Sequence, residues 1–591
     1  MDRNWVTKVS ILRNIQSYIL ALGLFYAAII FLPFLSNSYI LPKLGILYIT
    51  ASLLIFIEAV ITLIAHKNYC FYKSDLVIAV LLITHSINYA FSVNRIISFY
   101  GMYQQEGLGY ISVLCYCMFG FIYARLPKGK NTLILVFFIA ASTLSSLYSI
   151  LLFSKVNPRP DGLEGQPILS SLIIAIGILS AASLWNEKYR WYIKIIIICA
   201  VLIHSLALFI LQSSTVIFSL ISTLLILVVL KLYTTKTKKI KLIFITLLCT
   251  FLLLLLYFIP KKSFSVSQRS LEYSSAIKML RSVKNLGRII VGYGQNTSGY
   301  GYKIYRNPAL NLTKERNWDL SKIRNHYMEI IYTQGLIGII FWLGLIIFSL
   351  RKRHNPFSYM FYFLILWQLF YYLTPLTYIF YLFGLVNSYN RNYTLVYTIF
   401  LKRALLCITL LLLGIYYIYT AITFLVADFE SHRGHINQAI AIFPYNSEYY
   451  YQETYAYYDR IFHYRLNHSC ISRHTCTSLY LLSQYNQAHQ SAERTTSRNP
   501  NESRYWDLRG TLLFFHALDT PKEHDQLLRK ALQFHRFAFY LDPTNYNIAD
   551  NIGSIYMEMK DYQRATYFFR KSLYLYPDYL PAKNHLAEIL R

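Results

Sequence analysis

Apolar residues gather along the first 426 positions in runs long enough to cross a lipid bilayer. A spanning helix needs about 20 consecutive, mainly apolar residues. The runs lie near 15–35, 44–65, 74–93, 107–125, 131–154, 168–186, 191–211, 213–231, 239–260, 329–350, 357–373, 375–388 and 403–426. The last two before 403 are short and are separated by Pro375, so they are the weakest of the set. The pattern predicts an all-α, polytopic membrane bundle of about 12–13 spans.

Composition supports a membrane protein and argues against a nucleic-acid-binding one. The chain of 591 residues is 55% hydrophobic and 14% charged, whereas soluble domains average about 25% charged residues. The net charge of +29 comes largely from short Lys and Arg clusters between apolar runs. Clusters of this kind orient a chain in the membrane, and nucleic-acid binding would need a basic stripe on a soluble fold.

The basic clusters also predict the topology. The start of the chain, "MDRNWVTK", is basic and is therefore placed in the cytoplasm. Every second connection should then be cytoplasmic, and each of these carries Lys or Arg, as in "KLYTTKTKK" and "RKRH". The long segment 261–328 and the residues after about 427 fall on the opposite side. The prediction is a multi-pass membrane protein, with a membrane domain at 1–426 and an extracytoplasmic domain at 427–591. In a bacterium this would be the inner membrane, with the second domain in the periplasm.

Residues 427–591 carry a repeat pattern instead of apolar runs. The stretch "NYNIADNIGSIYMEMKDYQRATYFFRKSLYLYP" matches the 34-residue tetratricopeptide pattern. Its signature positions hold Gly553, Tyr556, Ala565, Phe569, Ser572 and Pro577. Pro543 lies one repeat length before Pro577. We expect three to four helix pairs in an α-solenoid, which would bind a peptide or partner domain or would only brace the membrane domain.

Eight cysteines are present, and two of them differ from the rest. Cys470 and Cys476 lie in the polar part as "SCISRHTC", while the other six lie in or beside apolar runs. A disulfide is possible in an oxidising compartment, and two free thiols fit the sequence equally well.

Two arginines on the outer side are candidates for anion binding. Arg159 lies in "NPRPDGLEGQPILSS", where Gly and Pro restrict the loop immediately before an apolar run. Arg269 lies in "SVSQRSLEYSSAIKMLRS", which has helical spacing. A guanidinium is always charged and can donate two hydrogen bonds to one phosphate group. Taken singly, Arg159 also fits an interfacial anchor, and Arg269 fits a solvated surface helix.

A third candidate opens the apolar run at 329–350 with the sequence "RNHYMEIIYTQGLIGII". His326 could act as a general base, because its ordinary pKa lies near neutrality, and Arg324 could bind an anion. A lone histidine is more often structural. His326 and Glu329 have no further metal ligands nearby in the sequence, so no metal site is expected.

Four stretches together resemble the bacterial O-antigen ligase and polymerase superfamily, which includes protein O-oligosaccharyltransferases. In order they are "SFYGMYQQEGLGYISVL", "RPDGLEGQP", "QRSLEYSSAI" followed by "VGYG", and "RNHYMEIIYTQGLIGII". In the second stretch Arg159, Gly162, Gly165 and Pro167 are in register with the family pattern, and Gln166 stands where the family has Asn. In the third, Tyr273 stands where Trp is common. The likeness covers roughly residues 70–390.

The resemblance implies a membrane glycosyltransferase of the GT-C type. It implies a glycan on a polyprenyl diphosphate, usually undecaprenyl diphosphate, as donor, and a hydroxyl of a glycan, lipid or protein as acceptor. Arg159 and Arg269 match the family's diphosphate-binding arginines, with Asn325, Glu329, Gly162 and Gly165 in supporting places. The family needs no metal, nucleotide sugar or other cofactor.

The sequence departs from the family at the position of its usual histidine. Counting back from Gly335 and Leu336 places Asn325 at the family's Asn and Arg324 at its His. His326 lies two residues further on. Two residues that are two apart point about 200° apart on a helix, so Arg324 and His326 can converge only if the helix begins after them. Either residue remains a candidate for the catalytic role.

Several functions fit the same sequence. Within the superfamily, a ligase, a polymerase of glycan repeats and a protein O-glycosyltransferase are not separable. From another class, a non-catalytic membrane scaffold for envelope glycan assembly would use the C-terminal repeats to bind partners. A transporter would place charged residues in the middle of its spans, and the apolar runs hold few of them.

Overall fold

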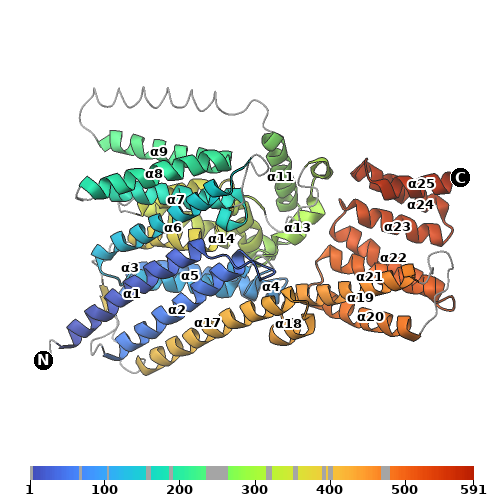
Figure 1. Ribbon diagram of the computed structural model, residues 1–591, viewed down its shortest axis with the longest axis horizontal. Helices are drawn as coiled ribbons and strands as arrows, with labels where there is room; N and C mark the ends of the chain where they lie inside the picture. The colour runs from blue at the N-terminus through green and yellow to red at the C-terminus, as the bar shows by residue number, and fades with distance from the viewer. Residues whose placement is uncertain are drawn as a thin grey trace. The chain divides into compact units, whose positions relative to one another are not determined.

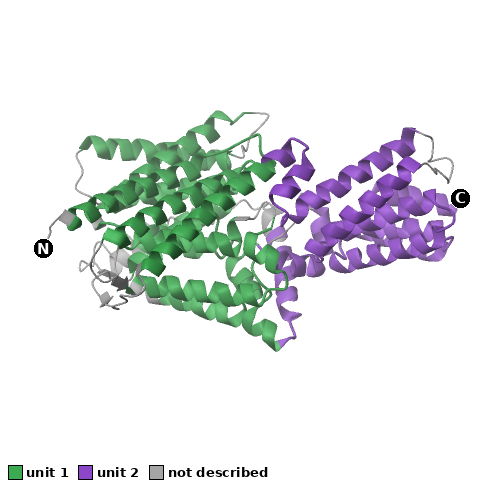
Figure 2. Ribbon diagram, turned by 90° about the horizontal axis from the view of Figure 1, so that it is seen from below, with its two compact units in different colours: residues 1–263, 286–295, 324–428 green, residues 264–285, 296–323, 429–591 purple. Residues whose placement is uncertain are grey.

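The computed structural model describes residues 4–64, 70–102, 106–154, 162–185, 191–234, 264–313, 323–350, 357–388, 394–396, 403–467 and 479–591 (Figure 1). Arg159, the cysteines Cys470 and Cys476 and the predicted span at 239–260 lie outside these residues. The chain forms two compact units (Figure 2). Unit 1 comprises 1–263, 286–295 and 324–428, and unit 2 comprises 264–285, 296–323 and 429–591. Much of the segment 261–328 therefore groups with the C-terminal residues.

Unit 1 is almost entirely helical over the residues that the structure describes. Its helices are α1 (Asn4–Ile29), α2 (Ile40–Ile64), α3 (Lys73–Ala90), α4 (Arg95–Tyr100), α5 (Tyr110–Tyr123), α6 (Asn131–Leu151), α7 (Pro167–Trp185), α8 (Trp191–Leu211), α9 (Ser214–Thr234), α12 (Leu286–Val291), α14 (His326–Leu350), α15 (Ser358–Trp367), α16 (Pro375–Ser388) and α17 (Arg403–His432), the last of which continues into unit 2. Short 3₁₀ turns occur at η1 (Glu106–Leu108), η2 (Lys128–Lys130) and η3 (Gly162–Glu164). Strands β1 (Cys70–Tyr72) and β2 (Thr394–Val396) form one small antiparallel pair, with Cys70 opposite Val396.

Seven of the described helices are long and apolar enough to cross a membrane. They are Trp5–Ile29, Ile40–Ile64, Asn131–Leu151, Pro167–Trp185, Trp191–Leu211, His326–Ile347 and Ala404–His432. Four shorter apolar helices are Ser74–Ala90, Tyr110–Tyr123, Ser214–Leu227 and Ser358–Trp367. All of them overlap predicted runs, although the first begins ten residues before the run predicted at 15–35. The all-helical fold is confirmed and is compatible with a membrane protein, while the number of 12–13 spans and the topology stay predictions.

The first predicted span, 15–35, is displaced in the structure. Helix α1 begins at Asn4 and ends at Ile29, ahead of Pro33. The residues after it form a turn in which Leu32 N–H donates to the Ser38 carbonyl at 3.1 Å. Proline disfavours helix in the residue before it and cannot donate its own hydrogen bond, so the apolar run "FLPFL" does not extend the helix.

Small polar side chains line the helix contacts of unit 1. Helix α6 packs against α1, α7 and α8, and Figure 1 shows α7, α8 and α9 side by side. A Cβ on Gly177 of α7 would lie 2.2 Å from the Ser142 Oγ of α6, and that hydroxyl also lies 3.0 Å from His204 Nε2 of α8. Glycine and serine let helix backbones approach closely. In lipid the hydrophobic effect does not drive helices together, so their association depends on this close packing and on hydrogen bonds between them.

Unit 2 combines pieces of the segment 261–328 with the C-terminal helices. Its elements are α11 (Phe264–Arg281), α13 (Ser298–Tyr305), η4 (Pro308–Leu312), α18 (Ile436–Ile442), α19 (Ser447–Asn467), α20 (Leu479–Arg498), α21 (Ser503–Asp519), α22 (His524–Leu541), α23 (Tyr546–Glu558), α24 (Tyr562–Leu575) and α25 (Leu580–Leu590).

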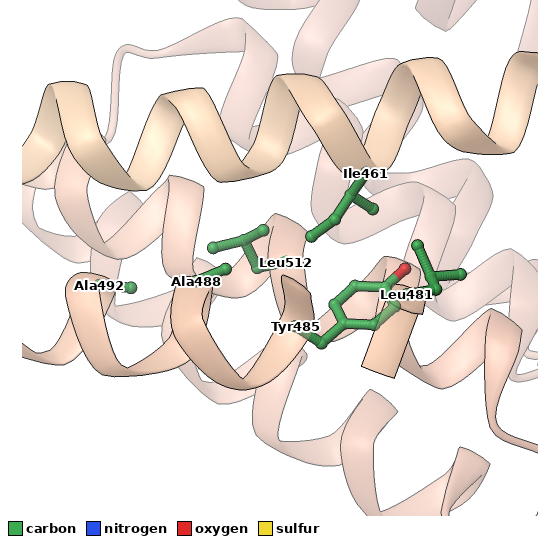
Figure 3. Packing of buried hydrophobic residues seen from close by; sticks show 6 residues of the cluster. All are labelled: Ile461, Leu481, Tyr485, Ala488, Ala492 and Leu512. Atoms are coloured by element: carbon green, nitrogen blue, oxygen red, sulfur yellow. The ribbon is translucent and has the colours of Figure 1, made fainter. Parts of the chain in front are cut away.

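The C-terminal helices pack as consecutive pairs. Helix α19 packs on α20, α21 on α22 and α23 on α24, and each pair also contacts the next. Figure 3 shows the buried core of the first pair, where Ile461 of α19 and Leu512 of α21 lie against Tyr485 and other side chains of α20. A Cβ on Gly553 would lie 2.6 Å from the Phe569 ring, so glycine sets the approach of α23 and α24. The helix pairs are a finding, while their assignment as tetratricopeptide repeats stays a prediction.

Two histidines meet beside this core. His489 Nε2 of α20 lies 3.1 Å from His516 Nδ1 of α21, and the Tyr485 ring stacks on His516 with centroids 4.4 Å apart. Burial, with the nearby His516 and Arg509 as lesser causes, lowers the pKa of His489 to about 4. Burial also lowers the pKa of His516, and Glu523 and Asp519 oppose that shift.

This pair makes the stability of α20 and α21 sensitive to acid. A histidine whose pKa falls from 6.5 to about 4 on folding contributes stability above pH 6.5, and that stability is lost as the pH falls toward 4. We expect the free energy of opening of residues 479–519, measured by hydrogen exchange, to fall by about 2 kcal/mol between pH 7 and pH 4. His489→Gln should remove much of this slope. His463→Gln is the control, because that side chain is 62% exposed; an unchanged slope in His489→Gln would contradict the assignment.

Candidate functional site

Arg324, Asn325 and His326 form a buried cluster at the start of α14 in unit 1. Asn325 caps the helix: its Oδ1 accepts from Met328 N–H at 3.0 Å, and its carbonyl accepts from Glu329 N–H at 2.9 Å. Its Nδ2 also donates to the Leu369 carbonyl at 2.7 Å. Helix α14 begins at His326, so Arg324 lies outside it, and the helical separation of about 200° does not apply to this pair.

His326 is held by its backbone and by its ring. Its N–H donates to the Gln368 carbonyl at 2.9 Å, and its ring packs edge-on against Trp342 with centroids 5.3 Å apart. Trp342 in turn donates from Nε1 to Gln368 Oε1 at 2.9 Å and stacks on Tyr381. Gln368 therefore holds the backbone of His326 through its carbonyl and the ring of Trp342 through its side chain.

The connection between α15 and α16, residues 368–374, links this cluster to the 162–166 loop. Tyr371 OH donates to Gln166 Oε1 at 3.3 Å. Tyr372 interacts electrostatically with Arg324 and Glu329 and is hydrogen-bonded to Tyr371. Two of the four stretches that resemble the glycosyltransferase superfamily thus meet on one connecting loop.

The 162–166 loop has a shape that depends on its glycines. Gly162 and Gly165 have φ of +67° and +71°. A Cβ on Gly162 would lie 2.3 Å from Ser170 Oγ, and one on Gly165 would lie 2.5 Å from the Tyr39 ring. Side chains rarely adopt this backbone conformation, and neither position has room for one. Arg159, three positions before Gly162, lies outside the described residues.

The same loop carries a buried ion pair. Lys43 Nζ of α2 lies 2.9 Å from Glu164 Oε1, and both side chains are largely buried. Burial raises the pKa of the Glu164 carboxyl, and the Lys43 ammonium opposes that shift. A buried charge requires a partner of this kind, so the pair fastens the loop to α2.

The remaining two stretches reach α14 further along. Tyr293 and Gly294 of "VGYG" donate their N–H groups to the carbonyls of Tyr332 and Thr333 at 3.1 and 2.9 Å. The rings of Tyr293 and Tyr332 stack with centroids 4.6 Å apart. In the first stretch, Ser98 Oγ donates to the Gln295 carbonyl at 2.8 Å. Parts of all four stretches are therefore connected within unit 1.

Arg269 lies in unit 2, on α11. Its Nη1 donates to Glu272 Oε2 at 3.2 Å, one helical turn away, and its side chain is 23% exposed. Of the predicted site residues, Arg324, Asn325, His326, Glu329, Gly162 and Gly165 belong to unit 1, Arg269 belongs to unit 2, and Arg159 lies outside the described part of the chain.

Several residues of this site were not predicted from the sequence. The stretch "WQLFYYLTP" at 367–375 was taken as the end of the apolar run 357–373 and the break at Pro375. It supplies Gln368, Tyr371 and Tyr372, and its signal was a polar side chain and two tyrosines ahead of Pro375. The ion pair between Lys43 and Glu164 could not be predicted, because no local pattern in the sequence links two residues so far apart.

The described residues include no group of three or more His, Cys, Asp or Glu side chains that could hold a metal ion. Comparison with known proteins adds no family: no protein-family model matches the chain, and no curated protein matches it. The family and the activity are therefore proposals that rest on the residues and contacts described above.

Proposed function

We propose that the chain is a membrane glycosyltransferase that moves a glycan from a polyprenyl diphosphate carrier to an acceptor hydroxyl. The observation that carries the proposal is the connection, within unit 1, of parts of the four stretches; the part of the third stretch that holds Arg269 lies in unit 2. The connected parts are far apart in the sequence, and hydrogen bonds join 98 to 295, 293–294 to 332–333, 325–326 to 368–369 and 371 to 166.

The chemistry needs cations more than it needs a strong base. The acceptor oxygen forms a bond to the anomeric carbon of the glycan and loses its proton, to His326 or to the departing diphosphate, while the bond from that carbon to the diphosphate oxygen breaks. The leaving diphosphate takes the electron pair, so negative charge grows on it in the transition state. Preorganised guanidinium groups stabilise such charge through paired hydrogen bonds. Arg159, Arg269 and Arg324 are the cations proposed for this role.

The apolar helices suit the rest of the substrate. A polyprenyl tail is hydrocarbon and stays in the bilayer, so an enzyme that acts on its diphosphate must work at the membrane edge. The seven apolar helices of the described chain provide that setting. A ligase, a polymerase of glycan repeats and a protein O-glycosyltransferase share this chemistry and differ in the acceptor.

Arg159→Ala and Arg269→Ala test the proposal. Each should lower the amount of transferred glycan in the cell envelope and raise the amount of lipid-linked glycan, because each removes charge stabilisation from the leaving group. Arg281→Ala is the control, since this exposed arginine lies on the same helix as Arg269. If both test variants give normal product and no accumulated carrier, the activity is excluded and a scaffold role is favoured instead.

A further inference from the structure

Unit 2 contains a contact between α13 and the loop that connects α20 to α21. Lys303 Nζ lies 2.8 and 3.0 Å from the two carboxylate oxygens of Glu502, and the two side chains are 11% and 3% exposed. Beside this pair, Tyr300 OH donates to Asn499 Oδ1 at 2.8 Å. The residues that meet here are about 200 positions apart in the chain.

The contact is repeated on the next two loops of the helix pairs. Asn311 Nδ2, in η4, donates to the Thr544 carbonyl at 2.8 Å and the Leu575 carbonyl at 3.3 Å. Burial raises the pKa of the Asp542 carboxyl, and the cations Lys303 and Arg306 oppose that shift.

These contacts share one structural position. Asn499 and Glu502, Asp542 and Thr544, and Leu575 lie where a helix pair ends and the next begins. Each of these loops contains a proline, at Pro500, Pro543 and Pro577. Segment 298–312 therefore lies along one edge of the helix pairs and contacts the same point of successive pairs.

Segment 298–312 also packs against α11, the helix that carries Arg269. Ser275 Oγ of α11 accepts from Asn307 N–H at 3.0 Å, and Ser275, Ala276 and Met279 are buried. Helix α11 packs against both α13 and η4. A chain of contacts thus runs from the C-terminal helix pairs through α13 and η4 to the helix of Arg269.

We propose that the C-terminal helix pairs position Arg269, and that Lys303 and Glu502 are positioning residues that fasten its helix through α13. The loop edge of the helix pairs is then occupied by a segment of this same chain and is not left for a foreign peptide. The inference rests on the proposed function, since it assigns a purpose to the placement of Arg269.

The physical reason lies in the tolerance of a diphosphate site. A guanidinium contributes to charge stabilisation only if it is held within about 0.5 Å of its productive place. Over residues 268–281, whose side chains the structure describes, the buried positions of α11 form one stripe, so the position of the helix depends on the elements packed against that stripe. The buried ion pair supplies a directional contact that a slipped register would break. Leaving either charge buried without its partner carries a large penalty.

The test uses the full-length protein in lipid nanodiscs and reads hydrogen exchange at residues 264–281 and 298–312. Lys303→Met leaves the buried Glu502 carboxylate with only the longer Arg504 contact at 3.7 Å, so protection should fall about tenfold to a hundredfold. Lys303→Arg keeps the charge and should keep the protection. Lys303→Met with Glu502→Gln removes the orphaned charge and should regain most of it. Lys583→Met is the control, because its pair with Asp578 is exposed.

The second measurement is the kcat of glycan transfer. Lys303→Met should lower kcat in the same direction as Arg269→Ala, and combining the two should add little, because both act through one guanidinium. Unchanged protection in Lys303→Met, or a full additive loss in the combined variant, would overturn the positioning role. If Arg269→Ala leaves transfer unchanged while Arg159→Ala lowers it, the positioning role fails and the proposed function stands; if neither variant changes transfer, both fail. In that case a loss of protection in Lys303→Met would still show the contact to be structural.

Discussion

Arg324→Ala is expected to lower glycan transfer by about 100-fold to 1,000-fold, the range seen when one preorganised donor is removed from a site where charge develops. Arg324 stands at the position where the superfamily that this sequence resembles has histidine, and its buried side chain interacts with Tyr372, on the loop that also contacts Gln166. Arg324→Lys should recover only part of the activity, because an ammonium cannot make the paired hydrogen bonds of a guanidinium. The measurement is the initial rate of transfer from a lipid-linked donor.

His326→Phe is the matched variant. The His326 ring packs edge-on against Trp342, and phenylalanine preserves that contact while removing both ring nitrogens. If the ring serves mainly to pack, His326→Phe should stay within about tenfold of the wild-type rate. A loss as large as that of Arg324→Ala would instead assign the catalytic role to His326 and would contradict the register count.

The helices of unit 1 could be predicted well because their signal is local. A run of apolar residues has to be a helix in a bilayer, since every backbone hydrogen bond must be made within the segment. The boundaries were less certain for the same reason: the run around Pro33 is apolar, yet proline ends α1 at Ile29. An apolar run predicts which residues can be buried in the bilayer. It does not predict the residue at which the backbone hydrogen bonds of the helix end.

The site was only half predictable. Asn325 was expected beside a helix start, and its capping role follows from residue type and position. Asn325 and its neighbour His326 donate to the backbone carbonyls of Leu369 and Gln368. Every residue has such a carbonyl, so the sequence gives no sign of which residues accept these hydrogen bonds. The same holds for the grouping of α11 and α13 with the helix pairs, which depends on Lys303 finding Glu502 across the fold. Local patterns predict elements, while the pairing of distant elements depends on contacts that carry no local signal.

The two units also differ in what their sequences constrain. In unit 2, Gly553 is required by its close approach to Phe569, and it falls where the predicted tetratricopeptide pattern has a small residue. In unit 1 the glycines that lack room for a side chain are each required by their own local neighbours, with no repeat behind them. Gly335 is the strongest case, because the helix that contains it looks continuous in the sequence but is interrupted in the structure.

Gly335→Ala is expected to destabilise unit 1 by about 4 kcal/mol, the sum of a strained backbone and a clash with backbone atoms. Gly335 has φ of 66° and ψ of −161°, a region that is essentially restricted to glycine. A Cβ there would lie 2.4 Å from the Ile290 carbonyl oxygen and 2.7 Å from Gly292 N. Gly292, with φ of +76°, would place its own Cβ 2.2 Å from the Thr333 carbonyl oxygen. The two glycines face each other's backbones, so neither side can move away without breaking the hydrogen bonds from Tyr293 and Gly294 to α14.

Gly344→Ala on the same helix is the control, because a Cβ at Gly344 meets nothing within 4 Å. Alanine is favoured over glycine inside a helix by about 1 kcal/mol, so this variant should unfold at the same temperature or a slightly higher one. The measurement is thermal unfolding of the purified protein in detergent, followed by the loss of monodisperse protein. The two substitutions add the same methyl group nine residues apart, and only the one at the interruption should lower the unfolding midpoint. If both variants unfold at the same midpoint, the interruption at Gly335 does not hold α12 and "VGYG" against α14, and the connection between the third and fourth stretches is lost with it.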